Sequence, residues 1–330
     1  MINKNTNIKR NTRYRQSYHI TPQQNWMNDP NGLVYWNNEY HVFFQHEPNK
    51  TSPGLMHWGH VRSKDLIHWE HLPHALIPEE EYEKDGCWSG SAVDNQGTLS
   101  LFYTGHKEVD TEIEGVKQVQ CLAVSTDGVN FEKSKHNPVI DTFPKEGSAH
   151  FRDPKVWKHK DEWYMVVGTK RGNVGKVVLY RSLDLVSWDY VGVMLERNGN
   201  QGSMWECPDV FPLGKKHILM LSPIGIEVEG YRYQNHQNTV YFVGDLDYDT
   251  GQFHPESFQE LDLGFDFYAA QTFTDSMDRR LLLGWMDMWE SPIPTKKEGW
   301  AGSMTVPRVL TLSSDNQVNM SQLPYVTQRK

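Results

Sequence analysis

Three short motifs place a carboxylate among residues that can tune its proton affinity. In WMNDPNG (26–32), Asn28 and Asn31 are placed to donate hydrogen bonds to Asp29. Such donors lower the pKa of a carboxylate and keep it ionised, as a nucleophile requires. The same segment could instead be only a β-turn, because Asn, Asp, Pro and Gly all favour turns.

The other two motifs are FRDPK (151–155) and WECPD (205–209). In a pocket, Arg152 would hold Asp153 ionised and ready to accept hydrogen bonds from hydroxyl groups, whereas on the surface the pair would contribute little. Glu206 lies between a Trp and a Cys, and apolar surroundings raise the pKa of a carboxyl group and suit it to general acid catalysis. A position at the edge of a strand is the alternative for Glu206.

The spacing of these acids indicates that they meet. Asp29, Ser89, Asp153, Glu206 and Tyr268 follow one another at intervals of 60, 64, 53 and 62 residues. If each occupies the same place in a repeated unit around an axis, three carboxylates share one pocket. Two carboxylates with opposite pKa shifts can cleave a glycosidic bond, one attacking and one protonating the leaving oxygen.

A second pattern has the same period. Ser-x-Asp followed by an aromatic residue occurs in SKDLIHW (63–69), STDGVNF (125–131) and SLDLVSW (182–188), with a looser copy, DLDYDTGQF, at 245–253. Ser-x-Asp turns are common between strands, but copies about 60 residues apart indicate a repeat architecture. Four strands of about six residues with their loops make one propeller blade, so the period predicts five blades.

The segments between turn signals are short and rich in Val, Tyr, Phe and Trp, which predicts an all-β fold. Asn37-Asn38 predicts a hairpin turn, because Asn tolerates positive φ. The segments expected to form strands are 32–45, 97–105, 162–170, 176–182, 217–223, 239–247 and 279–287.

Residues from about 17 to 325 resemble the catalytic propeller of glycoside hydrolase family 32, the invertase, inulinase and levanase group. The motifs that carry the resemblance are WMNDPNG, FFQHEP, MHWGH, GCWSGS, FRDPKVW, MWECPD, DFYAAQTF, and GWAG followed by VPR. The resemblance implies a five-bladed β-propeller and a retaining double displacement. Asp29 would be the nucleophile, Glu206 the acid/base, and Asp153, with Arg152, a group that binds fructosyl hydroxyls and stabilises the transition state.

The resemblance also implies a sugar-binding site without metal or cofactor. The residues expected to line it are Trp26, Met27, Asn28, Gln45, Trp58, Trp88, Ser89, Arg152, Tyr268 and Trp285. The implied reaction is hydrolysis of the terminal β-D-fructofuranosyl bond of sucrose or sucrose-6-phosphate, with short fructans left open. The alternatives are fructosyl transfer, a non-catalytic sugar-binding propeller, and another five-bladed family with three carboxylates, such as the arabinan hydrolases.

Composition limits the partners and the compartment. The net charge is −9, which argues against nucleic acid or an anionic membrane as the main partner. Three cysteines in 330 residues suggest reduced thiols rather than a disulfide framework. The first twenty residues lack the apolar stretch of a secretory signal, and no run of about 18 apolar residues exists. A cytoplasmic enzyme acting on a small sugar is therefore expected.

We expect an N-terminal arm (1–16), a propeller (17–312) and a polar C-terminal tail without a further strand pair (313–330). The resemblance implies that the tail begins the linker to a β-sandwich that this chain lacks. The uncovered propeller face would then favour association into homo-oligomers. A second departure is Ser52-Pro53-Gly54, which stands where the family usually has a Trp, so one wall of the sugar site is expected to differ.

Several other residues have less specific interpretations. Cys207 is expected to pack rather than act as a second nucleophile. The clustered histidines lack a completing carboxylate or thiol set for zinc; they are His57, His60, His68, His71 and His74. Candidates for binding a substrate phosphate, or else solvated surface residues, are Lys155, Lys170, Arg171 and Arg232.

Overall fold

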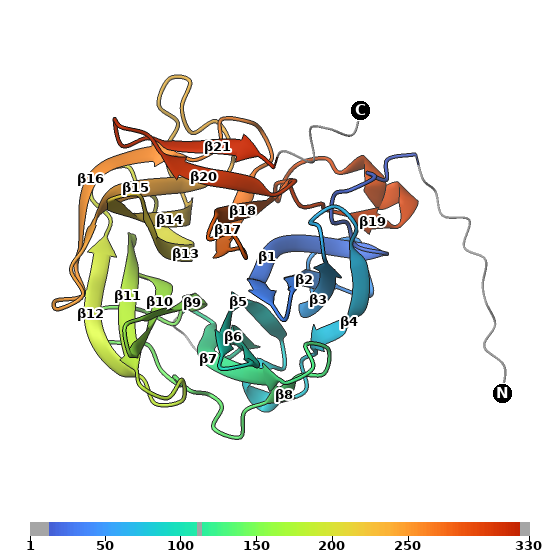
Figure 1. Ribbon diagram of the computed structural model, residues 1–330, viewed down its shortest axis with the longest axis horizontal. Helices are drawn as coiled ribbons and strands as arrows, with labels where there is room; N and C mark the ends of the chain where they lie inside the picture. The colour runs from blue at the N-terminus through green and yellow to red at the C-terminus, as the bar shows by residue number, and fades with distance from the viewer. Residues whose placement is uncertain (1–12, 111–113, 324–330) are drawn as a thin grey trace.

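The protein is a five-bladed β-propeller, as the repeat period and the resemblance predicted (Figure 1). The computed structural model describes residues 13–110 and 114–323. Each blade is a four-stranded antiparallel sheet, and the strands β1, β5, β9, β13 and β17 lie innermost around the central axis. The first blade gains a fifth strand, β19, which pairs in parallel with β1 and closes the ring.

The strands of the first two blades are β1 (Asn25–Trp36), β2 (Glu39–Glu47), β3 (His57–Ser63), β4 (Glu70–Leu76), β19 (Trp300–Ala301), β5 (Gly86–Asn95), β6 (Thr98–Glu108), β7 (Val116–Ser125) and β8 (Glu132–Lys133). The other three blades contain β9 (Phe151–His159), β10 (Glu162–Arg171), β11 (Val174–Ser182), β12 (Asp189–Glu196), β13 (Met204–Leu213), β14 (Lys216–Ile224), β15 (Val240–Leu246), β16 (Phe253–Glu260), β17 (Tyr268–Thr274), β18 (Arg280–Trp285), β20 (Arg308–Leu312) and β21 (Val318–Gln322). The short 3-10 helices are η1 (Glu81–Glu83) and η2 (Pro294–Glu298).

The Ser-x-Asp repeats join the third and fourth strands of successive blades. In the copy at 182–188, Ser182 Oγ accepts a hydrogen bond from Leu185 N at 2.9 Å, and Asp184 Oδ1 accepts from Val186 N and Ser187 N at 2.9 and 2.7 Å. The copy at 63–69 makes the equivalent bonds. These local bonds satisfy backbone donors that a turn would otherwise leave exposed, so the repeat can be recognised from sequence alone.

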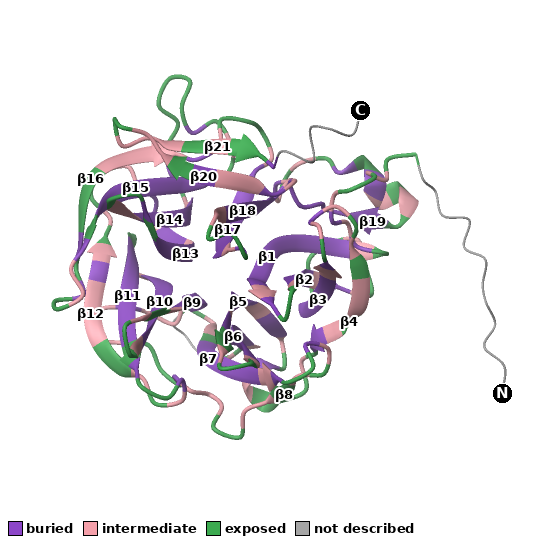
Figure 2. Ribbon diagram, viewed as in Figure 1, coloured by how far each residue is buried: buried purple, intermediate pink, exposed green. Residues whose placement is uncertain are grey.

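The hydrophobic core lies between neighbouring blades. The cluster between blades 1 and 2, for example, joins Phe43 and Trp58 with Leu101, Tyr103 and Ala123. Figure 2 shows that burial is greatest on the inner strands and that exposure increases toward the outer strands. Because each interface is close-packed, the inner strands form a rigid support for whatever lies at the axis.

The structure departs from the predicted C-terminal boundary and shows a contact at the N-terminal one. β21 pairs with β20 from Arg308↔Gln322 to Leu312↔Val318, so the fifth blade extends beyond residue 312. An outer strand that faces water on one side needs few apolar residues, so the polar sequence of this segment does not predict a strand. At the other end, the Arg15 guanidinium lies 4.1 Å from the ring centroid of Trp300 on β19, so the last residues of the predicted arm contact the propeller. Residues 1–12 and 324–330 lie outside the described residues.

Candidate active site

The five residues predicted to share an axial position all lie near the start of an innermost strand. Asp29 is on β1, Ser89 on β5, Asp153 on β9, Glu206 on β13 and Tyr268 on β17. On each of these strands the pairing with the second strand of the blade shifts register at this point. Such β-bulges bend a strand and redirect its side chains, and they are common beside active sites.

WMNDPNG is therefore part of a bulged strand and not only a turn. Ser89 Oγ donates to Asp29 Oδ2 at 2.6 Å, and Asn28 Nδ2 donates to Asp29 Oδ1 at 3.0 Å. Burial raises the pKa of Asp29, the two donors oppose this rise, and the charge of Glu206 adds to it. The predicted lowering of this pKa was wrong, because burial outweighs the donors. The side-chain amide of Asn31, predicted as a second donor, has no hydrogen-bond partner among the described residues.

Glu206 lies among polar groups, so its predicted apolar surroundings were also wrong. Arg152 donates to Glu206 Oε1 from Nε at 2.9 Å and from Nη2 at 2.7 Å. The Tyr268 hydroxyl lies 2.5 Å from Glu206 Oε2 and 3.0 Å from the carbonyl oxygen of Ser222. Both oxygens of this carboxylate are thereby held in place from β9 and β17.

Asp153 is buried and was expected to be kept ionised by Arg152. Instead the guanidinium pairs with Glu206, and Asp153 Oδ2 accepts from the backbone N of Cys207 at 2.9 Å. Burial and the charge of Glu206 raise the pKa of Asp153, and Arg152 only partly opposes them. Three carboxylates gathered in a buried site disfavour one another's charge. Burial and mutual repulsion therefore raise the pKa of both aspartates.

The Cys207 side chain lies between the two aspartates. Its Sγ is 3.8 Å from Asp29 Oδ2 and 3.6 Å from Asp153 Oδ2. Burial and the charge of Asp153 raise the pKa of this thiol, so it stays neutral. Among the described residues the Sγ contacts are carboxylates and not an imidazole, which is the usual activator of a nucleophilic thiol.

These side chains surround a cavity of ≈ 280 Å³. The residues that line it are Asn28, Asp29, Gln45, Pro53, Gly54, Met56, Trp88, Ser89, Arg152, Asp153, Glu206 and Trp289. Eight of them were predicted from sequence. The Ser52-Pro53-Gly54 departure does border the cavity, through Pro53 and Gly54, whereas Met56 and Trp289 were missed. The indole of Trp289 stacks on Trp26, with ring centroids 5.9 Å apart.

Five predicted site residues lie behind the cavity wall. Trp26 donates to Asn28 Oδ1 at 2.7 Å, and Trp58 donates to the carbonyl oxygen of Trp88 at 3.0 Å, so both support lining residues. Trp285 packs edge-on against Trp26 with ring centroids 5.6 Å apart, Met27 belongs to the core between blades 1 and 5, and Tyr268 reaches the site through Glu206.

The candidate phosphate ligands do not converge on the cavity. Lys155 is buried and paired with Asp209 at 3.0 Å, Lys170 lies 4.0 Å from Glu114, and Arg232 lies 3.8 Å from Glu260. None of these three, nor Arg171, lines the cavity.

The described residues contain no cluster of three or more His, Cys, Asp or Glu side chains arranged to hold a metal ion. Within the same part of the chain, no helix is long and apolar enough to cross a membrane. Of the clustered histidines, His74 pairs with His46 at 2.7 Å and His60 with His41 at 3.0 Å.

Comparison with known proteins agrees with this geometry. The model of the glycosyl hydrolases family 32 N-terminal domain matches residues 19–324. The chain is 49% identical to a sucrose-6-phosphate hydrolase of Escherichia coli over 93% of its own length, and 43% identical to one of Bacillus subtilis over 96%. It spans 64% and 67% of the length of these two relatives.

Among solved structures, a family 32 beta-fructofuranosidase of Bombyx mori superposes with a TM-score of 0.92 at 47% identity, covering 97% of this chain and 68% of that one. A mutant of the same enzyme was solved in complex with sucrose. A sucrose-6-phosphate hydrolase of Lactobacillus gasseri superposes with a TM-score of 0.88 at 30% identity, covering 96% of this chain and 64% of that one.

Proposed function

The chain belongs to glycosyl hydrolase family 32, and from that premise we propose that it hydrolyses the terminal β-D-fructofuranosyl bond of sucrose or sucrose-6-phosphate with retention of configuration. The observation that carries the proposal is the convergence of Asp29, Asp153 and Glu206, from three different blades, on one cavity. A retaining glycosidase needs one carboxylate to attack and a second to deliver and recover a proton.

In this proposal Asp29 is the nucleophile. Ser89 and Asn28 hold its two oxygens and favour the ionised form, while burial and the charge of Glu206 oppose it. Protonation of Glu206 removes one of the opposing causes. The proposed mechanism requires ionised Asp29 and protonated Glu206 before attack on the anomeric carbon.

Tyr268 allows Glu206 to exist in both protonation states. A phenol has one proton to donate, and the carbonyl oxygen of Ser222 can only accept. When Glu206 is protonated, it donates to the Tyr268 oxygen, which donates to Ser222; when Glu206 is ionised, it accepts from Tyr268. Burial raises the pKa of Tyr268 well above its usual value, so the phenol keeps its own proton throughout. Arg152 stabilises the carboxylate that forms once the proton has left.

The remaining groups bind the sugar. Asp153 is proposed to accept hydrogen bonds from fructosyl hydroxyls and to stabilise the positive charge that develops at the anomeric centre. Gln45 provides a polar group in the cavity wall, and Trp88 and Trp289 provide aromatic surfaces against which the sugar ring can pack. No step in this scheme uses a metal or an organic cofactor.

A substrate panel tests the proposal. Purified protein is incubated with sucrose, sucrose-6-phosphate, inulin and levan, and released fructose is measured. We expect the two disaccharides to be cleaved, with β-fructofuranose as the first product seen by NMR. Formation of fructosyl oligomers at high sucrose would indicate transfer, and sucrose binding without cleavage would indicate a non-catalytic module. If transfer is the main reaction, or if sucrose is bound and not cleaved, the hydrolase assignment is overturned.

A cytoplasmic site of action is part of the proposal. All three cysteines, Cys87, Cys121 and Cys207, are buried and unpaired, as suits a reducing compartment. Association into homo-oligomers stays a prediction from sequence, for which light scattering of the purified chain is the test.

A further inference from the structure

A second ring of buried polar residues lies just beyond the site residues on the same five inner strands. Its members follow Asp29, Ser89, Asp153, Glu206 and Tyr268 by two to four positions, on the far side of each bulge. We call these residues the second ring: Asn31 on β1, Ser91 on β5, Lys155 on β9, Asp209 on β13, and Gln271 and Thr272 on β17. Their exposure is between 0% and 8%.

Hydrogen bonds of the second ring join strands from different blades. Ser91 Oγ donates to the carbonyl oxygen of Pro154 at 2.8 Å and accepts from Val156 N at 3.0 Å, which joins β5 to β9. Gln271 Nε2 donates to the carbonyl oxygen of Gly90 at 3.0 Å, which joins β17 to β5. The second ring therefore links the innermost strands directly behind the site.

The strongest link is a buried ion pair. Lys155 Nζ donates to Asp209 Oδ2 at 3.0 Å and to the carbonyl oxygen of Thr272 at 2.7 Å. Asp209 Oδ2 also accepts from Thr272 N at 2.7 Å and from Thr272 Oγ1 at 3.0 Å. Blades 3, 4 and 5 are thus tied together at one point.

β9 and β13, which carry Asp153 and Glu206, are linked to each other on both sides of their bulges. On the cavity side, Arg152 of β9 holds Glu206 of β13. On the other side, Lys155 of β9 holds Asp209 of β13. Between the two clamps the backbone of Asp153 has a φ of 64° and that of Cys207 a φ of 48°, left-handed conformations that persist only where surrounding contacts hold them.

A purely structural explanation accounts poorly for this pair. Asp209 is fully buried, its Oδ1 has no hydrogen-bond partner among the described residues, and burial lowers the pKa of Lys155 against the opposing charge of Asp209. Apolar side chains of similar volume stabilise a core as well as a buried ion pair does, or better. What an ion pair adds is a defined geometry between two strands.

We propose that Lys155 and Asp209, together with Thr272, are positioning residues that set the separation of Asp153 and Glu206 and so the efficiency of the acid/base step. The inference rests on the proposed hydrolysis. It predicts that loss of the pair lowers turnover even where the fold is intact, because a misplacement of about 1 Å at a reacting group can cost about 100-fold in rate.

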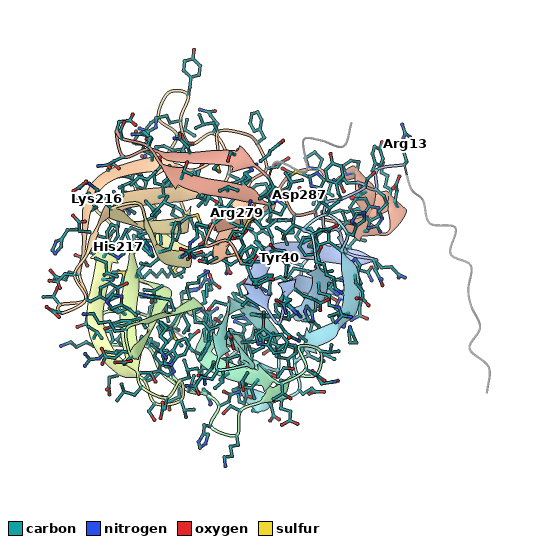
Figure 3. The ribbon with its side chains drawn as sticks, viewed as in Figure 1. Arg13, Tyr40, Lys216, His217, Arg279 and Asp287 are labelled. Atoms are coloured by element: carbon teal, nitrogen blue, oxygen red, sulfur yellow. The ribbon has the colours of Figure 1, made fainter. Side chains whose placement is uncertain are left out.

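The test is the double variant Lys155→Met/Asp209→Asn, which removes both charges and leaves no unpaired ion. We expect kcat on sucrose to fall about 10- to 100-fold, with a smaller change in KM, a shifted pH profile of kcat/KM, and a changed Asp153–Glu206 separation in a crystal structure. The matched control is Lys216→Met/Asp245→Asn at the periphery of blade 4, which removes the ion pairs of Lys216 with Asp245 at 2.8 Å and with Glu256 at 2.6 Å (Figure 3). The control should leave all of these readouts unchanged.

Wild-type kcat and pH profile in a folded double variant would overturn the proposal. If the double variant does not fold, the variant Lys155→Arg tests the proposal instead. It keeps the positive charge and changes the length and shape of the side chain that contacts Asp209. Lower turnover with a shifted pH profile supports positioning, and unchanged kinetics refute it. Absence of hydrolysis by the wild type would instead refute the proposed function. The distance between Asp153 and Glu206 in crystal structures of wild type and variant would still show whether Lys155 and Asp209 set that distance.

Discussion

Aspartates occupy two contrasting regions of this propeller, the axis and the outer turns. At the turns, backbone donors dominate: the N–H of Asn130 lowers the pKa of Asp127, and that of Ser187 lowers the pKa of Asp184. At the axis, Asp29 and Asp153 also accept hydrogen bonds, yet burial raises the pKa of both. The pKa of an aspartate is therefore shifted in opposite directions in the two regions, because the turn carboxylates stay hydrated whereas the axial carboxylates lose their water on burial.

The contrast predicts that the two sets of aspartates contribute to stability with opposite dependence on pH. A carboxyl whose folded pKa is lowered stabilises the fold above its unfolded pKa near 4, and this contribution is lost as pH falls. A carboxyl whose folded pKa is raised does the reverse: the folded state retains the proton, and ionisation at neutral pH costs stability. The buried aspartates at the axis therefore lower the stability of the fold at neutral pH.

Replacing the proposed nucleophile should produce the largest effect. Asp29→Asn removes the attacking carboxylate, so kcat on sucrose should fall on the order of 10⁴-fold or more. The melting temperature should be unchanged or higher, because a destabilising buried charge is lost. Scanning calorimetry and fructose release measure both. Near-normal cleavage, or a clear fall in melting temperature, would break the contrast between axis and turns.

Removal of one axial hydroxyl should have a smaller effect. Tyr268→Phe removes the partner of Glu206 Oε2 and leaves the ring in place. We expect kcat/KM to fall about 10- to 100-fold and its pH profile to shift, since general acid–base catalysis contributes about 10²- to 10⁴-fold. The control is Tyr241→Phe, because Tyr241 lies on β15 and packs in the core between blades 4 and 5. An unchanged pH profile would show that Tyr268 does not serve the acid/base group.

The paired histidines of blade 1 show how burial affects groups that carry a positive charge when protonated. Burial lowers the pKa of His41 and of His74 to about 4, and it also lowers those of His46 and His60. The unfolded chain binds these protons below pH 6.5 and the folded chain does not. Stability should therefore be full above pH 6.5 and fall progressively between pH 6.5 and about 4.

Urea midpoints between pH 7 and 5 measure this slope. Each histidine contributes at most about 1.4 kcal/mol per pH unit, reduced by solvent at the half-buried sites, and the axial aspartates act in the opposite direction. His74→Gln should flatten the slope, whereas His68→Gln, at an exposed side chain, should not. A wild-type midpoint that rises on acidification would contradict the assignment.

The smallest effect is expected at the turns. Asp184→Ala removes the acceptor of the Val186 and Ser187 amides. It should destabilise the fold by about 1 kcal/mol with no change in kcat. Asp189→Ala, an exposed substitution that removes no such turn bond, is the control. If Asp184→Ala lost activity without losing stability, the outer turns would affect the residues at the axis, contrary to this prediction.

Much of the site could be predicted because its signals are local and repeated. Asp29, Ser89, Asp153, Glu206 and Tyr268 recur at the blade period, and a period places them at equivalent points without knowledge of any contact. Trp289 has no such signal, because it reaches the cavity from the irregular segment between β18 and β20. The outer strand β21 escaped prediction because its polar residues lack the pattern of a buried strand.

The amino-acid sequence by itself determined the number of blades, the turn chemistry and which acids lie at the axis. Only the tertiary structure decided which group pairs with which: Arg152 with Glu206 rather than with its neighbour Asp153, and Lys155 with Asp209 rather than with solvent or a phosphate. It also decided the sign of the pKa shift at Asp29. The physical reason is that repeats and turns depend on bonds between near neighbours, whereas burial and ion pairing depend on strands more than 50 residues apart.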